Sequence, residues 1–279
     1  IDLLKRTPSS YLGSCRYKLP EISDDRETYE KIFEILRELN ISYFFYIGGN
    51  DSMDTIKKLS DYALLIGSDI KFMGVPKTID NDLAVTDHTP GFGSAAKFIA
   101  ATMKEIIRDG LVYDYPTVTI VEIMGRNAGY IALWCGIANG AEDILLPEKY
   151  DYDEQKIINN IIENRRKGKK HHIIVNAEGI GHSTSMARRI EAATGIETRA
   201  TILGHMQRGG SPTCKDRVYA SIMGAYAVDL LLEGKTDRVV AYKNGEYVDY
   251  DIDEALSMTK TLPEYQWEIA RALSYNYTK

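Results

Sequence analysis

Two aspartates stand two residues apart in the run Pro76-Lys77-Thr78-Ile79-Asp80-Asn81-Asp82, beside a lysine and a threonine. The run follows the apolar segment 70–75, which predicts a buried strand. Ligands of open α/β sheets bind at the carboxyl ends of strands. A carboxylate pair beside a cation suits phosphoryl transfer, because one carboxylate can act as a base while the other holds a metal ion. A plain polar turn after the strand is the alternative interpretation.

A glycine-rich loop, Gly48-Gly49-Asn50-Asp51-Ser52, lies one strand–helix unit earlier. It follows the apolar run 41–47, which is continuous enough to predict a strand in the interior of a sheet, and it precedes a helix predicted over 53–62. Glycines let the backbone approach a phosphate, and a helix start offers N–H groups. The carboxylate of Asp51 suits such a loop if a metal ion lies between it and the phosphate. A tight turn alone would also explain the two glycines.

Two further polar groups follow predicted strands. Met124-Gly125-Arg126 comes after a strand over 117–122, and Glu178 comes after a strand over 171–177. The guanidinium of Arg126 suits a sugar phosphate or hydroxyl, and Glu178 suits sugar hydroxyls as an acceptor. A surface ion pair for the arginine and a helix-entry position for the glutamate are the alternatives.

The segment 197–210 carries Arg199, His205 and Arg208 within ten residues, next to flexible glycines. Planar guanidinium groups and a ring N–H donor together suit a phosphate monoester. One histidine alone is more often structural, but the three residues together predict an anion pocket.

Strand and helix patterns alternate along the chain, which predicts α/β architecture with parallel sheets in two lobes. The remaining predicted elements are strands over 70–75 and 143–146 and helices over 24–39, 91–108, 153–167 and 216–232.

The chain has 279 residues, of which 44% are hydrophobic and 27% are charged, as is ordinary for a globular protein. The net charge of −6 gives no reason to expect nucleic acid or a membrane as a partner, and no apolar run approaches the ~20 residues of a membrane span. Cys15, Cys135 and Cys214 are too widely spaced for a metal site, so a reducing cytoplasm is the expected location.

These runs occur in the order found in the 6-phosphofructokinase family, which the sequence resembles from about Leu12 to the C-terminus. The resemblance implies an α/β fold of two Rossmann-like lobes with parallel-rich sheets. It also implies a phosphoryl-donor lobe, residues 1–92 and 208–258, and a sugar-phosphate lobe, residues 93–207 and 259–279.

The resemblance also implies site roles. Asp80 matches the base that takes the proton from the 1-hydroxyl of fructose 6-phosphate, Thr78 contacts that hydroxyl, and Arg16 stabilises the phosphoryl group in transfer. Magnesium is the implied cofactor, and its ligands would be Asn50, Asp51 and Asp82. The implied sugar-phosphate ligands are Met124, Gly125, Arg126, Glu178, Arg199, His205 and Arg208. Arg199 would come from a neighbouring subunit, which requires a homodimer or homotetramer.

Two charged residues bear on the phosphoryl donor. The family members that use ATP usually carry glycine at the positions of Asp51 and Lys77. Large charged side chains there would crowd the nucleotide, and a lysine would neutralise a released phosphate. The sequence therefore most resembles the pyrophosphate-dependent phosphofructokinases, which transfer a phosphoryl group reversibly between pyrophosphate and fructose 6-phosphate.

The sequence also departs from the family pattern. The family begins with a strand and a Gly-Gly-Asp-x-Pro-Gly-type phosphate loop, and nothing before Ile1 supplies them, so we expect the true N-terminus to be missing. Asn50 replaces a magnesium-binding aspartate of many relatives, and Thr117 replaces an intersubunit arginine. The alternatives are an ATP-dependent phosphofructokinase, a non-catalytic sugar-phosphate-binding subunit, and a kinase with a related loop that acts on a nucleotide or lipid.

Overall fold

The computed structural model describes residues 11, 13–15, 17–149 and 153–274, and its chain divides into two compact units. The first unit takes the described residues up to Thr78, together with 82–91 and 211–260. The second unit takes residues 79–81, 92–210 and those from Thr261 onward. The chain thus passes between units inside the Pro76–Asp82 run.

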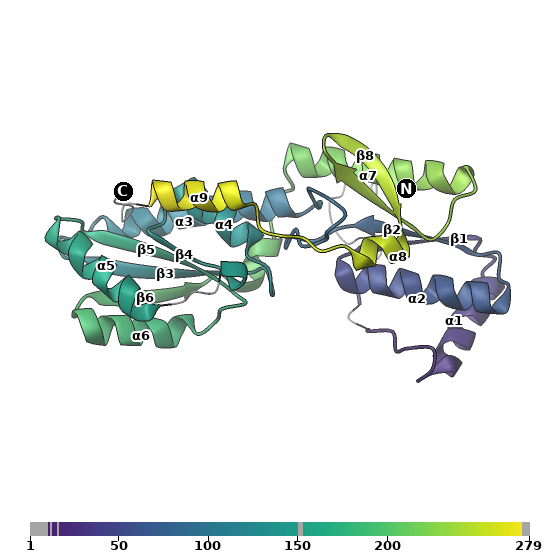
Figure 1. The fold of residues 1–279 in the computed structure, drawn as a ribbon, viewed down its shortest axis with the longest axis horizontal. Helices are drawn as coiled ribbons and strands as arrows, with labels where there is room; N and C mark the ends of the chain where they lie inside the picture. Colours follow the sequence, from purple (N-terminus) through teal and green to yellow (C-terminus); the bar gives the residue numbers. More distant parts are fainter. Residues whose placement is uncertain (1–10, 12, 16, 150–152, 275–279) are drawn as a thin grey trace. The chain divides into compact units, whose positions relative to one another are not determined.

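The first unit is built on a four-stranded sheet in the order β1-β2-β7-β8, in which β8 alone runs antiparallel to its neighbour. Alternate side chains of β2 enter different cores, with Phe72 facing one and Met73 the other. Helices α1, α2 and α8 build the first of these cores and α7 builds the second, so the sheet is covered on both faces (Figure 1). The elements are α1 (Arg26–Glu38), β1 (Tyr43–Gly48), α2 (Asn50–Ile66), β2 (Lys71–Pro76), α7 (Cys214–Leu232), β7 (Arg238–Lys243), β8 (Glu246–Asp251) and α8 (Ile252–Ser257).

The second unit is built on an all-parallel sheet in the order β4-β5-β3-β6. Helices α3, α4 and α9 pack on one face, and α5 and α6 pack on the other. The elements are α3 (Phe92–Gly110), β3 (Thr117–Ile123), α4 (Tyr130–Asn139), β4 (Asp143–Leu145), η2 (Pro147–Lys149), α5 (Glu154–Arg166), β5 (His171–Ala177), α6 (Ser183–Thr194), β6 (Glu197–Ile202), η3 (Gly204–Arg208) and α9 (Glu264–Leu273).

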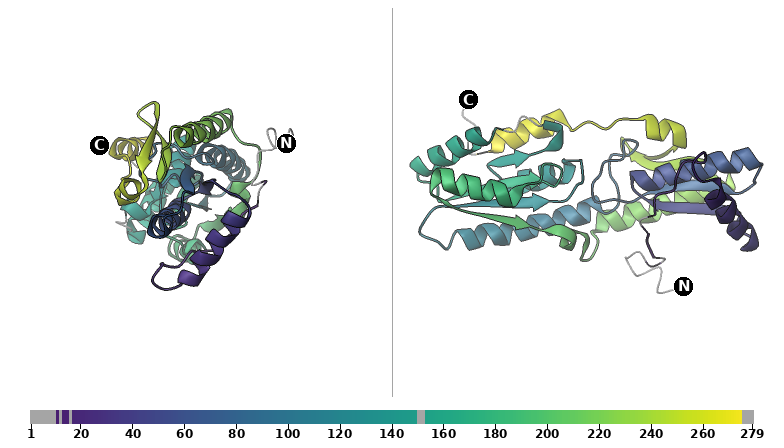
Figure 2. Two further views of the ribbon diagram at one scale, coloured as in Figure 1. Left: turned by 90° about the vertical axis from the view of Figure 1, so that its right-hand side faces the viewer. Right: turned by 90° about the horizontal axis from the view of Figure 1, so that it is seen from below.

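Each unit is therefore a helix–sheet–helix sandwich, which confirms the predicted α/β class with parallel-rich sheets. Figure 2 shows α1 and α2 of the first unit on the same side of their sheet. The rings of Tyr29 and Tyr62 contact each other between these helices, with their centres 5.1 Å apart and their planes tilted by 41°. Among the described residues, no helix is both long and apolar enough to cross a membrane.

Two sequence predictions in the first unit are wrong. The run 41–47 predicted an interior strand, but β1 is the outermost strand of the described sheet, and Tyr43 and Ile47 are 48% and 58% exposed. Its continuous apolar character does not distinguish an edge from an interior strand. The helix predicted from Met53 begins instead at Asn50, because Gly49 is its N-cap, so Asn50 and Asp51 lie in the first helical turn.

Candidate active site

In the first unit, the loops after β1 and β2 lie next to each other. Parallel pairing places Gly48 opposite Pro76, and the amide of Lys77 donates to the carbonyl of Gly48 at 2.9 Å. The glycine-rich loop and the Pro76–Asp82 run therefore start from the same edge of the sheet. Lys77 is exposed immediately beyond its strand.

Gly48 and Gly49 allow the backbone to turn closely into α2. A Cβ on Gly48 would lie 2.0 Å from Oγ of Ser52, so no larger residue fits without movement. A Cβ on Gly49 would lie 3.7 Å from Cβ of Thr78, which places the loop against the second strand end. Asp51 is exposed in the first turn, where the positive end of the helix dipole favours a negative group.

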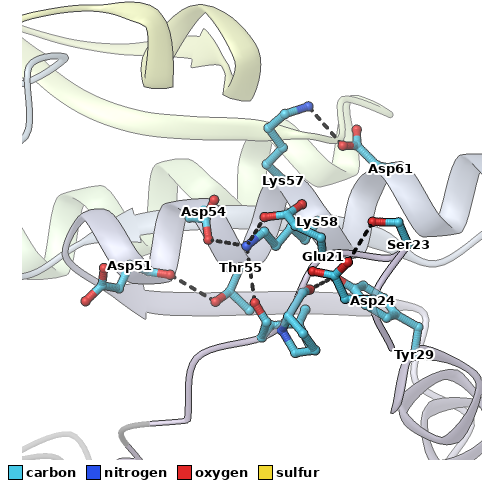
Figure 3. Close-up of polar contacts among 12 residues, drawn as sticks. Glu21, Ser23, Asp24, Tyr29, Asp51, Asp54, Thr55, Lys57, Lys58 and Asp61 are labelled. Atoms are coloured by element: carbon cyan, nitrogen blue, oxygen red, sulfur yellow. Dashed lines mark hydrogen bonds and ion pairs between the residues drawn. The ribbon is translucent and has the colours of Figure 1, made fainter. Parts of the chain in front are cut away.

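Helix α2 is anchored by a buried lysine. The ammonium group of Lys58 bonds to the carbonyl of Leu19 at 3.2 Å and to the carboxylates of Glu21 and Asp54 at 2.7 and 2.9 Å (Figure 3). The carboxylates raise the pKa of Lys58 and outweigh its burial. The chain before α1 is thus tied to α2. Asp51 lies one turn before Asp54, nearer the start of that helix.

Two of the three predicted magnesium ligands meet directly. Nδ2 of Asn50 donates to Oδ2 of Asp82 at 2.7 Å. The described part of the chain holds no cluster of three or more His, Cys, Asp or Glu side chains able to bind a metal ion. Magnesium commonly takes only one or two protein carboxylates and completes its shell with phosphate and water. The pair of Asn50 and Asp82 is therefore compatible with an ion that arrives with phosphate.

The segment after the aspartate pair is fastened to the rest of the first unit. The amide of Thr78 donates to the carbonyl of Pro90 at 3.2 Å, and the hydroxyl of Thr89 donates to the carbonyl of Thr78 at 2.8 Å. The residue before Thr89 is buried His88, which bonds through Nε2 to Asp216 of α7 at 2.7 Å. The C-terminal end of this segment is thus held both to Thr78 and to α7.

Lys260 contributes another cation to this region of the first unit. Its ammonium group donates to the carbonyl of Thr86 at 2.8 Å. Burial, and to a smaller extent repulsion by Lys243, lower the pKa of Lys260 to about 8, whereas Asp87 and Asp82 act to raise it.

The second unit brings three strand ends together. Parallel pairing places Ile123 opposite Ala177 and Glu122 opposite Ile202. The residues that follow β3, β5 and β6 therefore share one edge of the sheet, where α/β proteins bind ligands. Met124-Gly125-Arg126, Glu178 and the turn η3 all lie at this edge.

The carboxylate of Glu178 holds the loop after β3. Its Oε2 accepts from the amides of Gly125 and Arg126 at 3.2 and 3.0 Å. Both residues have positive φ, 152° and 56°, and a Cβ on Gly125 would lie 2.3 Å from the carbonyl oxygen of Ala128. Glu178 therefore has a bracing role that the sequence did not indicate, in addition to its expected contact with a sugar.

Turn η3 presents His205 and Arg208 to solvent and directs Gln207 inward, where its side chain is 1% exposed. Oε1 of Gln207 accepts from the amide of Met124 at 3.1 Å, and Nε2 donates to the carbonyl of Gly204 at 3.0 Å. Sequence reasoning passed over Gln207, although it lies between two of the predicted residues.

Arg199 does not reach this edge of the sheet. It lies within β6, opposite Thr119, on the outermost strand. Its Nε donates to Glu197 at 2.7 Å, and its Cζ lies 5.9 Å from the ring centre of Tyr113. Glu197, more than Tyr113, raises the arginine pKa. Within its own unit, Arg199 is therefore not brought together with His205 and Arg208, which lie beyond the end of β6.

Asp80 belongs to the second unit and is half-buried. Ile79 on one side packs against the core of α3 and α4, and Asn81 on the other is buried with φ of 53°. Two ordered neighbours thus fix the backbone at Asp80. Arg16 lies outside the described residues.

The model of the phosphofructokinase family matches residues 1–231. The match covers far more than half of the chain, and the chain therefore belongs to the phosphofructokinase family, whose members are phosphotransferases that act on fructose 6-phosphate and are generally oligomeric.

The names of the similar proteins refer to two different phosphoryl donors, ATP and pyrophosphate. The chain is 45% identical over 245 residues to a protein named ATP-dependent 6-phosphofructokinase from Clostridium botulinum, covering 88% of this chain and 74% of that protein. Among solved structures it resembles a pyrophosphate-dependent phosphofructokinase from Marinobacter aquaeolei, with 30% identity, a TM-score of 0.79 and coverage of 93% and 69%. The corresponding enzyme from Nitrosospira multiformis gives 29% identity, a TM-score of 0.82 and coverage of 94% and 70%.

Proposed function

We propose that the protein transfers a phosphoryl group from pyrophosphate to the 1-hydroxyl of fructose 6-phosphate, reversibly, as a step of cytoplasmic glycolysis and gluconeogenesis. The observation that carries the choice of donor is the pair of charged residues beside the Gly48–Gly49 turn. Asp51 lies in the first turn of α2 and Lys77 follows β2, at neighbouring strand ends. The family resemblance implies glycine at both positions in members that use ATP. A small donor leaves room for such side chains.

Asp80 acts as the base. As its carboxylate accepts the proton of the sugar hydroxyl, the hydroxyl oxygen forms a bond to the attacked phosphorus, and the bond from that phosphorus to the bridging oxygen of pyrophosphate breaks. The products are fructose 1,6-bisphosphate and phosphate. Thr78 orients the hydroxyl, and Arg16 and Lys77 stabilise charge on the transferred and released groups.

Asp82, with Asn50 and Asp51, would hold magnesium. When bound, the ion supplies positive charge against the donor oxygens. The direct contact of Asn50 with Asp82 supports this assignment, because it keeps two oxygen-bearing side chains at the place where donor phosphate would lie.

The second unit would hold the sugar phosphate. Arg126, His205 and Arg208 present cationic or N–H donor groups at one sheet edge, with Met124 and Gly125 shaping the loop. Oε2 of Glu178 bonds to backbone amides, so its Oε1 is the atom that accepts from a sugar hydroxyl. Arg199 would complete the pocket of a second copy in a homodimer or homotetramer.

An ATP-dependent reaction is the second candidate, and the name of the Clostridium botulinum relative favours it. A non-catalytic subunit is the third, but the intact Pro76–Asp82 run argues against it because such a subunit has no use for a base.

The reverse reaction separates the two donors. Fructose 1,6-bisphosphate and magnesium are incubated with inorganic phosphate or with ADP, and fructose 6-phosphate is measured. We expect rapid formation with phosphate and release of pyrophosphate. Formation that requires ADP would reject the pyrophosphate assignment and support the ATP-dependent alternative.

A further inference from the structure

The buried side chain of Gln207 connects two loops of the proposed sugar-phosphate site. Its two neighbours in sequence on either side are exposed: His205 and Met206 before it, and Arg208 and Gly209 after it. A buried amide within an exposed turn needs both of its polar ends satisfied. Here both ends have partners, one in each loop.

One end of the amide fixes the loop after β3. The amides of Met124, Gly125 and Arg126 are consecutive, and each donates to a side-chain oxygen, the first to Gln207 and the other two to Glu178. Two consecutive residues with positive φ make this conformation unfavourable on its own. The loop that carries Arg126 therefore depends on acceptors supplied by other segments.

The other end of the amide fixes turn η3. Nε2 of Gln207 donates to the carbonyl of Gly204, whose φ of 56° begins the turn that carries His205 and Arg208. A single rigid group thus sets the distance between Arg126 on one loop and His205 and Arg208 on the other.

We propose that Gln207 is a positioning residue for fructose 6-phosphate: its amide holds the loop of Arg126 and the turn of His205 and Arg208 in the geometry that binds the sugar phosphate. This inference rests on the proposed sugar-phosphate site. Loss of the amide leaves the N–H of Met124 and the carbonyl of Gly204 without these partners, and the two loops then move independently.

The test compares variants of Gln207 with a matched buried amide of the same unit. Gln207→Met keeps the length of the side chain and removes both hydrogen bonds, whereas Gln207→Glu keeps the acceptor and removes the donor. Asn164→Leu is the control, because Asn164 is 3% exposed on α5 and bonds to His172 near the start of β5, at the opposite end of that strand from Glu178. Calorimetry measures the Kd for fructose 6-phosphate, and kinetics and thermal unfolding measure the donor KM and Tm.

We expect Gln207→Met to raise the Kd for fructose 6-phosphate about tenfold or more, with the donor KM unchanged. Asn164→Leu should lower Tm and leave that Kd unchanged. If Gln207→Met does not fold, Gln207→Glu provides the test and should also raise the Kd. A folded variant of Gln207 with the parent Kd would overturn the positioning role alone. A parent protein that binds no fructose 6-phosphate would instead reject the proposed function.

Discussion

The first unit presents the charged groups assigned to the donor on exposed positions, whereas the second unit holds its sugar-phosphate loops with buried or bonded side chains. Asp51 and Lys77 are exposed at the start of a helix and the end of a strand. Gln207 and Glu178 instead satisfy three consecutive backbone amides of one loop. Exposed side chains can be exchanged without rebuilding the backbone, so on the proposed assignments a change of donor needs only side-chain substitutions, whereas the loop that carries Arg126 depends on the side chains that bind its amides.

Asp80, the proposed base, lies outside this contrast, and its loss should have the largest effect. Asp80→Asn keeps the shape of the side chain and removes the proton acceptor, so kcat should fall roughly 10²- to 10⁴-fold. The Kd for fructose 6-phosphate should stay near the parent value. Steady-state kinetics and calorimetry measure the two quantities, and unchanged turnover would remove the catalytic assignment of Asp80.

Replacing the exposed residues Asp51 and Lys77 should change the preferred phosphoryl donor. In the double variant Asp51→Gly and Lys77→Gly, kcat/KM for pyrophosphate should fall roughly 10²-fold, because charge next to the donor is lost. The Kd for fructose 6-phosphate should not change, and turnover with ATP should rise.

An exposed loop lysine of the same unit serves as the control for this exchange. Lys18→Gly removes a positive charge from another exposed position. It should leave both donors unaffected. A double variant with the donor preference of the parent would contradict the role given to Asp51 and Lys77.

The loop after β3, whose amides bind Gln207 and Glu178, should tolerate substitution poorly. Gly125→Ala places a Cβ 2.3 Å from a backbone oxygen at φ of 152°, so we expect a loss of roughly 1–3 kcal/mol in the free energy of unfolding and weaker binding of fructose 6-phosphate. Gly140→Ala is the matched control, since its φ of 64° is also positive but its Cβ meets nothing within 4 Å. Equal sugar affinity in the two variants would show that the loop after β3 does not need its observed shape.

The smallest effect concerns Lys260 and pH. Its folded pKa is lowered from 10.5 to about 8, so between those values the unfolded chain binds more protons than the folded protein. The free energy of unfolding therefore rises with pH in that window, by about 1 kcal/mol from pH 8 to 9. Lys260→Met should remove this increment in denaturant titrations at the two pH values. An identical pH dependence in parent and variant would show that Lys260 is solvated.

Strand ends could be predicted well from the sequence. The bounds of β5, 171–177, are confirmed, and Met124 and Glu178 directly follow strands as predicted, because continuous apolar runs bounded by polar residues mark buried parallel strands. The same signal was wrong for β1, since an edge strand packed on two faces is also apolar.

Contacts between distant segments could not be predicted. Nothing in the sequence around Gln207 indicates that its side chain reaches Met124, 83 residues earlier, because glutamine is ordinarily a surface residue. Arg199 was noticed for its charge, but its place inside β6 went unrecognised, because the three consecutive polar residues Glu197-Thr198-Arg199 break the alternation that predicts a strand.

The ratio of kcat/KM for pyrophosphate to kcat/KM for ATP, measured with fructose 6-phosphate and magnesium on the unsubstituted protein, tests the central claim most directly. The account predicts a ratio of about 100 or more, because the side chains of Asp51 and Lys77 crowd a nucleotide and suit a small anionic donor. A ratio below one would contradict it and would assign the protein to the ATP-dependent phosphofructokinases.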